Sequence, residues 1–272
     1  MKLIDAHCHL ASPHYHDVEG LIRRSRKAGI VGVIAVGSDL VSSRNVLELQ
    51  EKYPDFVFAA AGIHPERASV SQKEVEAVCR LIEEEQSRLV AVGEIGLPYY
   101  SVGGGEVTEG LLEERKELLK QFLKVARKVK LPVVLHAPHS CANLALSLLQ
   151  EVGIERAMFH WHKAPQEVTQ AIVQHHYFIS LTPELCYRER DQEIAKQVPL
   201  SNLLLETDGP WPFKGEFEGK ETEPPFIVRA AQKVAEMKGV DLEEVGKSTF
   251  ENSVRLFRLH QFFPETSRFQ RS

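Results

Sequence analysis

The sequence predicts an α/β fold, a single-domain (β/α)8 TIM barrel. Eight short apolar runs rich in β-branched residues alternate with amphipathic segments, and polar side chains follow the ends of most of these runs. A strand followed each time by a helix favours a parallel sheet, and eight such units favour closure into a barrel. The length of 272 residues is typical of one such barrel. A doubly wound open sheet is the structural alternative.

The expected elements follow one another along the whole chain. The predicted strands are 2–7, 31–36, 56–62, 89–94, 132–136, 157–160, 177–181 and 202–207. Helical segments are predicted near 17–28, 41–52, 71–86, 111–129, 140–151, 165–175, 188–196, 224–238 and 241–259. The irregular stretches 97–110 and 209–225 each come directly after a strand, where barrel loops form the rim of an active site.

Composition limits the class of protein and its partners. Hydrophobic residues make up 43% and charged residues 26%, which is typical of soluble globular proteins. The net charge of −5 argues against a protein that grips long stretches of duplex, so any nucleic acid should be held locally. Without a long apolar run or a signal-peptide pattern, we expect no membrane contact and a cytoplasmic location.

Other features of the sequence say less about function. The four cysteines lie far apart, without metal-binding spacing, and are expected to be reduced core residues. No interdomain linker stands out, so residues 1–261 are predicted to form one domain and 262–272 a flexible tail. The oligomeric state stays open, and a monomer is compatible with the sequence.

The segment IDAHCHL, residues 4–10, is the first indication of metal chemistry. Asp5, His7 and His9 alternate at the end of the first predicted strand. Because alternate side chains of a strand point to the same face, all three are expected to share one face. Two imidazoles on one face form a chelate for a transition metal.

Polar residues at the other strand ends strengthen this interpretation. The set consists of His7 and His9 after strand one, His64 after three, Glu94 after four, His136 after five, His160 after six and Asp208 after eight. In a barrel these ends converge on one mouth. Several imidazoles with two carboxylates exceed one tetrahedral site, so we expect two divalent ions, from among Mg, Mn, Zn and Fe.

Two carboxylates have predicted catalytic roles. Glu94 ends the apolar run LVAV within GEIG, where glycines let the backbone approach closely, and is expected to bridge the two ions. Asp208 follows NLLLET and is expected to act as a ligand and as the general base. His160 is preferred as the ligand after strand six, although His162 has the same strand parity.

Supporting residues are predicted around these ligands. Asp5 and Glu206 could orient ligand imidazoles by hydrogen bonds, or serve as capping or core-network carboxylates. Lys163, Trp161 and Trp211 follow strand ends and could contact a phosphate or stack on a base. Ordinary packing at the rim is the alternative for the two tryptophans.

Six segments together resemble a known family. IDAHCHL, AAGIHPE, AVGEIGL, LPVVLHAP, MFHWH and LLLETDGPW occur in the order and with the spacing of the motifs of TatD-type metal-dependent deoxyribonucleases, a branch of the amidohydrolase superfamily. The resemblance extends from residue 3 to about residue 258, including ENSVRLF, which looks like the C-terminal helix of the family.

The resemblance implies a TIM barrel with one to three divalent metals that hydrolyses phosphodiester bonds, often trimming DNA from an end. Carried over by motif, His7, His9, Glu94 and Asp208 would bind one metal, and Glu94 would bridge to a second held by His136 and His160. His64, in GIHP, would meet a substrate phosphate.

The sequence departs from the family pattern at three places. Pro98 replaces the acid of GEIGLD, HAPHS places Pro138 and His139 where an arginine is frequent, and Trp161 follows His160. These changes leave the ligands intact but keep a second hydrolase open, one that cleaves an amide or ester, for example on an acylated nucleic-acid end. A non-enzymatic metal-binding scaffold is the third hypothesis.

Overall fold

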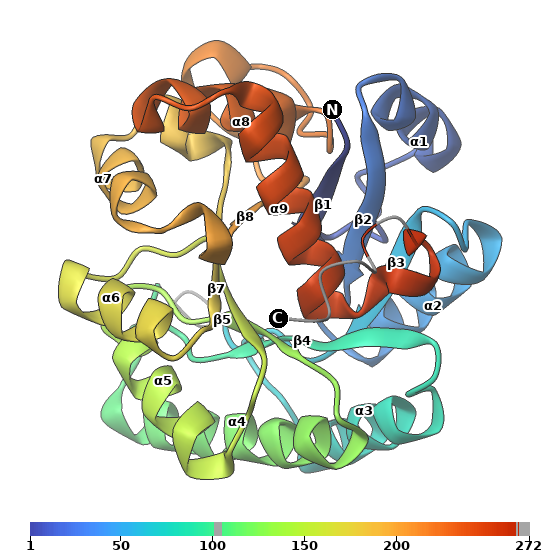
Figure 1. The fold of residues 1–272 in the computed structure, drawn as a ribbon. Helices are drawn as coiled ribbons and strands as arrows, with labels where there is room; N and C mark the ends of the chain where they lie inside the picture. The colour runs from blue at the N-terminus through green and yellow to red at the C-terminus, as the bar shows by residue number, and fades with distance from the viewer. Residues whose placement is uncertain (101–104, 265, 267–272) are drawn as a thin grey trace.

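The computed structural model describes residues 1–100, 105–264 and 266, and in them eight parallel strands form the wall of a barrel (Figure 1). The strands are β1 (Leu3–Cys8), β2 (Ile30–Val36), β3 (Val57–Ala61), β4 (Leu89–Gly96), β5 (Val133–His136), β6 (Ala157–His160), β7 (Phe178–Leu181) and β8 (Leu203–Leu205). Neighbours in space follow chain order, which confirms the predicted barrel and excludes the doubly wound alternative.

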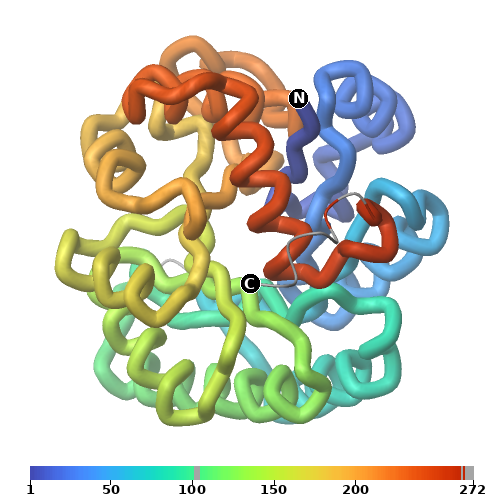
Figure 2. The backbone as a smooth tube through the Cα atoms, in the orientation of Figure 1, coloured from blue at the N-terminus to red at the C-terminus, as the bar shows by residue number. Residues whose placement is uncertain are grey.

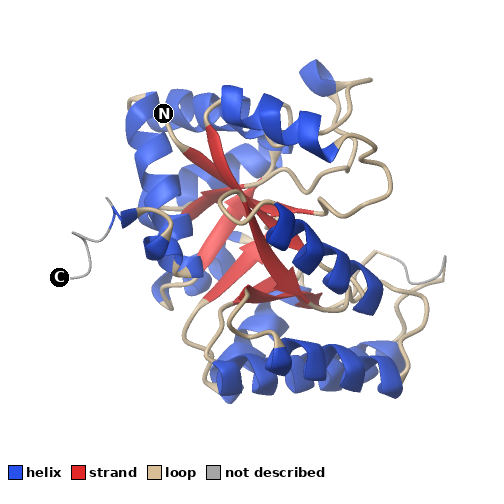
Figure 3. Cartoon of the chain, turned by 90° about the vertical axis from the view of Figure 1, so that its right-hand side faces the viewer, coloured by secondary structure: helices blue, strands red, loops and turns tan. Residues whose placement is uncertain are grey.

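Helices surround the strands on the outside (Figure 3). They are α1 (Val18–Lys27), α2 (Leu40–Lys52), α3 (Gln72–Glu84), α4 (Glu109–Val129), α5 (Cys141–Val152), α6 (Gln166–Gln174), α7 (Glu189–Gln197), α8 (Phe226–Lys238) and α9 (Leu242–Phe257). Each lies within about two residues of a predicted helical segment. No helix in the described ranges combines the length and apolar character that a bilayer crossing requires.

The seam between β1 and β8 is joined by specific bonds. Asp5 is fully buried and accepts hydrogen bonds from the backbone N–H (2.9 Å) and the hydroxyl (2.5 Å) of Thr207. One step nearer the mouth, the N–H of Asp208 donates to the carbonyl of His7 at 2.9 Å. These contacts hold the segment after β8 against the end of β1, although His7 and Asp208 are 201 positions apart in the sequence.

Helix α9 closes the bottom of the barrel. Figures 1 and 2 show it crossing the centre of the ring of strands. Its Phe250, Val254 and Phe257 pack against a buried cluster inside the barrel. That cluster includes Ile4, Ala6, Ile34, Phe58, Val134, Met158 and Leu204. Because α9 covers the N-terminal end of the strands, the barrel interior opens to solvent at their C-terminal end in the part of the chain that the structure describes.

The predicted flexible tail, 262–272, begins with residues that pack on this bottom. Phe263 is buried, and the centroid of its ring lies 5.2 Å from that of the Phe250 ring. Its backbone N–H donates to the carbonyl of Leu259. Thr266 is buried as well. The rest of the predicted tail, 265 and 267–272, lies outside the described residues.

Register shifts in β1 and β4 change where side chains point. The pairing of β1 with β2 shifts between Asp5 and Cys8, and that of β4 with β5 shifts between Val92 and Ile95. A shift of this kind, a β-bulge, breaks the alternation of faces. The expectation that Asp5 shares the face of His7 is therefore wrong: Asp5 turns to the seam and bonds Thr207.

Candidate metal centre

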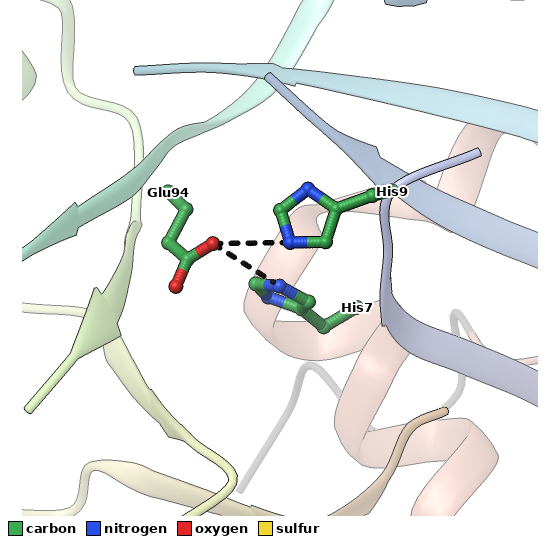
Figure 4. A group of neighbouring side chains, drawn as sticks. All are labelled: His7, His9 and Glu94. Atoms are coloured by element: carbon green, nitrogen blue, oxygen red, sulfur yellow. Dashed lines mark ion pairs between the residues drawn. The ribbon is translucent and has the colours of Figure 1, made fainter. Parts of the chain in front are cut away.

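Four of the predicted ligands meet at one point of the mouth. His7 Nε2 lies 3.5 Å from Glu94 Oε2 and 3.3 Å from Asp208 Oδ1. His9 Nε2 lies 3.3 Å and 3.4 Å from the same two oxygens. Figure 4 shows both imidazoles directed at the Glu94 carboxylate from the end of β1. We call these four atoms the first donor group.

A second donor group lies on the other side of Glu94. Glu94 Oε1 is 3.0 Å from His136 Nδ1 and 2.8 Å from His160 Nε2, and these two nitrogens are 3.2 Å apart. The two histidines are paired residues at the ends of neighbouring strands β5 and β6. In-register pairing therefore places them side by side, as the strand-end prediction requires.

Glu94 joins the two groups because each of its oxygens faces a different one. Its side chain is fully buried, and the β4 register shift directs it into the mouth. The surrounding glycines permit this placement: a Cβ on Gly93 would lie 2.7 Å from Val134 Cβ, and one on Gly96 would overlap the carbonyl of His136. The predicted close backbone approach at GEIG is confirmed.

Unpaired buried atoms show that the first donor group suits a cation. His7 Nε2 and Glu94 Oε2 are buried, and neither has a hydrogen-bond partner in the part of the chain that the structure describes. Leaving such atoms unpaired is costly. Four ligands at about 2.0–2.1 Å from a tetrahedral ion lie about 3.3–3.4 Å from one another, which matches these separations. The donor set and its spacing therefore fit a divalent metal.

The electrostatics of the mouth agree with this fit. Burial opposes the charged form of His9, but the nearby carboxylates of Asp208 and Glu94 raise its pKa to about 9. Burial likewise opposes the charged form of His136, but its hydrogen bonds with Glu66 and Glu94 raise its pKa to about 9. Burial would raise the pKa of Glu94, but the neighbouring imidazoles hold it well below its ordinary value. The centre thus keeps its carboxylates ionised and attracts positive charge.

Glu206 orients one ligand. Its Oε1 faces His160 Nδ1 at 3.3 Å and accepts from the N–H of Trp161 at 2.7 Å, while Oε2 accepts from the Ser180 hydroxyl at 2.6 Å. A carboxylate only accepts hydrogen bonds, so His160 carries a proton on Nδ1 and directs Nε2 at Glu94. Of the two predicted supporting carboxylates, Glu206 orients His160 and Asp5 joins the seam.

His162 lies away from the centre. Trp161 adopts a left-handed conformation (φ +37°) that ends β6 and rotates the next residue outwards. His162 is buried, and its Nε2 pairs with the hydroxyl of Thr169 at 2.9 Å. Burial lowers its pKa to about 3. The structure therefore places His160, and not His162, in the second donor group.

His64 lies beside the second group, and its two ring nitrogens have different partners. Its Nε2 is 3.3 Å from Glu94 Oε1, and its Nδ1 accepts a hydrogen bond from the backbone N–H of Glu66 at 3.2 Å. Glu66 itself reaches the mouth, with Oε1 3.2 Å from His136 Nε2. Glu66 directly follows GIHP at a strand end, but it is not among the site residues predicted from the sequence.

A cavity of about 780 Å³ opens above the donor groups. Lys163 and Trp211, both predicted to contact substrate, line it together with Trp161. The ammonium of Lys163 lies 3.7 Å from the centroid of the Trp161 ring and bonds the Tyr100 hydroxyl at 3.1 Å. Trp211 is 54% exposed and packs edge-on against Trp161. One wall of the cavity is thus aromatic.

Glu184 is a second residue of the site that was not predicted from the sequence. It follows β7, which like β2 has no predicted polar end residue, and lines the cavity. Its Oε2 accepts from Trp161 Nε1 at 3.1 Å and from Arg190 at 2.8 Å, and lies 3.9 Å from Lys163 Nζ. Glu184 thus fixes the indole and two cations at the rim.

Comparison with known proteins places this site in a family. A family model described as TatD related DNase matches residues 4–258. A Haemophilus influenzae protein named as an uncharacterized metal-dependent hydrolase is 34% identical over 257 residues, covering 94% of this chain and 100% of its own. The human protein named deoxyribonuclease TATDN3 is 32% identical over 265 residues, covering 94% of each chain.

A solved structure has the same architecture. The crystal structure of YjjV, a TatD homologue from Escherichia coli, aligns with a TM-score of 0.84 at 27% sequence identity. The alignment covers 94% of this chain and 98% of that one.

Proposed function

This chain belongs to the family of TatD-related DNases, and on that premise we propose that it is a two-metal deoxyribonuclease that shortens a DNA strand from one end. As a family member it is a metal-dependent hydrolase of phosphodiester bonds. The observation that carries the two-metal proposal is Glu94, whose two oxygens face separate donor groups. A carboxylate shared in this way is the usual bridge of a two-metal site.

The proposed ligands divide between the two groups. His7, His9, Glu94 and Asp208 would hold one ion, and Glu94, His136 and His160 the other. Imidazole-rich sites suit Zn, Mn or Fe, whereas Mg prefers oxygen ligands and several waters. Bound divalent ions supply Lewis acidity toward the phosphate and make water a nucleophile near neutral pH.

Asp208 would act on the attacking water. Its Oδ1 faces His7 and His9, and the carboxylate lines the cavity where a phosphate would lie. As the water oxygen bonds to phosphorus, Asp208 accepts the water proton, and the bond from phosphorus to the leaving sugar oxygen breaks. Burial opposes ionisation, yet the nearby imidazoles of His7 and His9 keep the pKa of Asp208 below its ordinary value.

Three other residues would bind the substrate. His64 points Nε2 at the centre with Nδ1 already occupied, so it would donate a hydrogen bond to a phosphate oxygen. Lys163 would contact a neighbouring phosphate, because it lines the cavity with its ammonium 3.1 Å from the Tyr100 hydroxyl. Trp211 offers an exposed ring on which a base would stack.

End-labelled single-stranded DNA tests this function. Metal-stripped protein would be supplied with Mg²⁺, Mn²⁺ or Zn²⁺, and the products resolved on a sequencing gel. We expect a ladder that shortens from one end with metal, and a loss of at least about a hundredfold in rate for Asp208→Asn. Asp55→Asn, an exposed aspartate paired with Arg26, is the matched control and should cleave normally.

Two results would count against the proposal. Equal rates for Asp208→Asn and the wild type would remove Asp208 from the mechanism. Intact DNA in the presence of bound metal would favour the acyl hydrolase, and a parallel screen of esters and amides would reveal it.

A further inference from the structure

We propose that Glu66 is a positioning residue that makes His136 a metal ligand and His64 a hydrogen-bond donor by fixing which nitrogen of each ring faces the centre. The inference rests on the proposed metal groups and concerns how they are assembled. Glu66 follows β3 and does not belong to either donor group.

The side chain of Glu66 acts on His136. Its Oε1 lies 3.2 Å from Nε2, while Nδ1 of the same ring faces Glu94 Oε1 at 3.0 Å. A ring that gives its Nδ1 lone pair to an ion carries its one proton on Nε2, and a carboxylate accepts that proton's hydrogen bond. Glu66 thus orients the ring of His136 by accepting a hydrogen bond from Nε2. Glu206 orients the ring of His160 in the same way, but through Nδ1.

The backbone of Glu66 acts on His64. Its N–H donates to His64 Nδ1 at 3.2 Å, so the lone pair of the neutral ring is on Nδ1 and its proton is on Nε2. That Nε2 is the atom directed at Glu94 Oε1, 3.3 Å away. His64 and His136 therefore carry the proton on the same nitrogen but turn opposite nitrogens to the centre, one as a donor and the other as a ligand.

Glu66 is itself held in place. Its Oε1 also accepts from the backbone N–H groups of Tyr99 and Tyr100, each at 3.1 Å, and only 17% of its side chain is exposed. These tyrosines follow Pro98, where the family pattern has an acid. Glu66, in the segment after β3, thus bonds the backbone of the loop after β4. Because the carboxylate is fixed before a metal arrives, it can orient His136 without further ordering.

Metal titration in the absence of DNA tests the role of Glu66. Apo protein would be titrated with Co²⁺ or Zn²⁺ against a chromophoric chelator, and the Co²⁺ absorption spectrum recorded. Loss of the partner of a ligating histidine weakens metal binding about 10–100-fold. We expect Glu66→Ala to weaken the second of the two binding steps by that factor and to change the Co²⁺ spectrum, with the first step retained.

Glu66→Gln separates orientation from direct ligation. The amide oxygen still accepts from His136 Nε2–H, so we expect a loss of less than about fivefold. Glu184→Gln and Glu184→Ala are the matched controls, because they remove the same charge from the same cavity without a bond to an imidazole, and should leave both binding steps unchanged.

Two outcomes would overturn the proposal. If Glu66→Gln loses as much affinity as Glu66→Ala, the carboxylate binds the ion directly. If Glu66→Ala lowers the melting temperature of the apo protein but leaves both binding steps intact, Glu66 only holds the loop at Tyr99 and Tyr100. Neither result depends on whether DNA is cleaved, so failure of this inference is distinct from failure of the proposed nuclease activity.

Discussion

A buried imidazole can be a ligand, a hydrogen-bond donor or a packing group, and we propose that three histidines of this chain fill these three roles. His160 turns Nε2 to Glu94, and His64 accepts a hydrogen bond from a backbone N–H at Nδ1. His162 pairs with Thr169 of α6, away from the centre. The residue type is the same in each case. What differs is the partner of the nitrogen that faces away from the centre.

Matched substitutions of His160 and His162 should separate ligation from packing. His160→Gln removes an imidazole from the second donor group, so the metal content measured by mass spectrometry should fall by one ion per chain. His162→Gln loses the buried contact with Thr169 and should lower the free energy of unfolding by about 1–3 kcal/mol, with metal content unchanged. Loss of metal from His162→Gln would contradict the assignment of these two side chains.

At the scale of elements, two bulged strands direct the central side chains. Ala6 packs inside the barrel with Ile4, so strict alternation would turn His7 outwards. The register shift between Asp5 and Cys8 brings His7 into the mouth instead. The shift in β4 does the same for Glu94. Bulges next to active sites commonly re-aim a side chain in this way.

Helix ends at the opposite face are held by an arginine. Arg156 donates to the carbonyl of Lys130, at the end of α4, at 2.8 Å, and to that of Leu256, in the last turn of α9, at 2.9 Å. Carbonyls at a helix C-terminus have no partner within the helix and carry partial negative charge. Arg156 satisfies two helices at once and helps to fix the plug formed by α9.

Arg156→Met keeps most of the aliphatic side chain but removes both hydrogen bonds. We expect the free energy of unfolding in urea to fall by about 1–3 kcal/mol. Arg23→Met, at an exposed position of α1, is the control and should change it by less than about 0.5 kcal/mol. Equal effects of the two substitutions would show that the contacts of Arg156 with the helix ends do not stabilise the fold.

At the scale of the whole molecule, the barrel collects ligands from positions 7 to 208 at one end and closes the other with α9. Among them, His7 Nε2 and Glu94 Oε2 are buried and have no hydrogen-bond partner among the described residues. A bound ion relieves that cost only in the folded state. Metal binding is therefore linked to global stability.

Divalent metal should accordingly raise the melting temperature. An ion at a hundredfold excess over its Kd adds about 2.7 kcal/mol to the free energy of unfolding, which for a chain of this size shifts the melting temperature by roughly 5–10 °C. Calorimetry with Mn²⁺ and then with excess chelator would show the rise and its reversal. His7→Gln should reduce the shift, and an undiminished shift in that variant would place the stabilising ion elsewhere.

The sequence predicts the barrel and most of its mouth for a physical reason. The strand and helix periodicities are local, and a parallel barrel brings the C-terminal ends of its strands together. Any ligand-type residue after a strand therefore falls in the same place, as His136, His160 and Asp208 do. These residues could be named without knowing one contact between them.

By itself, then, the sequence determined the fold class, the strand ends and the types of donor atom gathered there. Tertiary structure decided which way each side chain turns. Bulges in β1 and β4 assign Asp5 to the seam and Glu94 to both donor groups, and Glu66 and Glu184 act through partners that are distant in sequence. These outcomes depend on strand register and on hydrogen bonds between remote segments, which local sequence patterns do not encode.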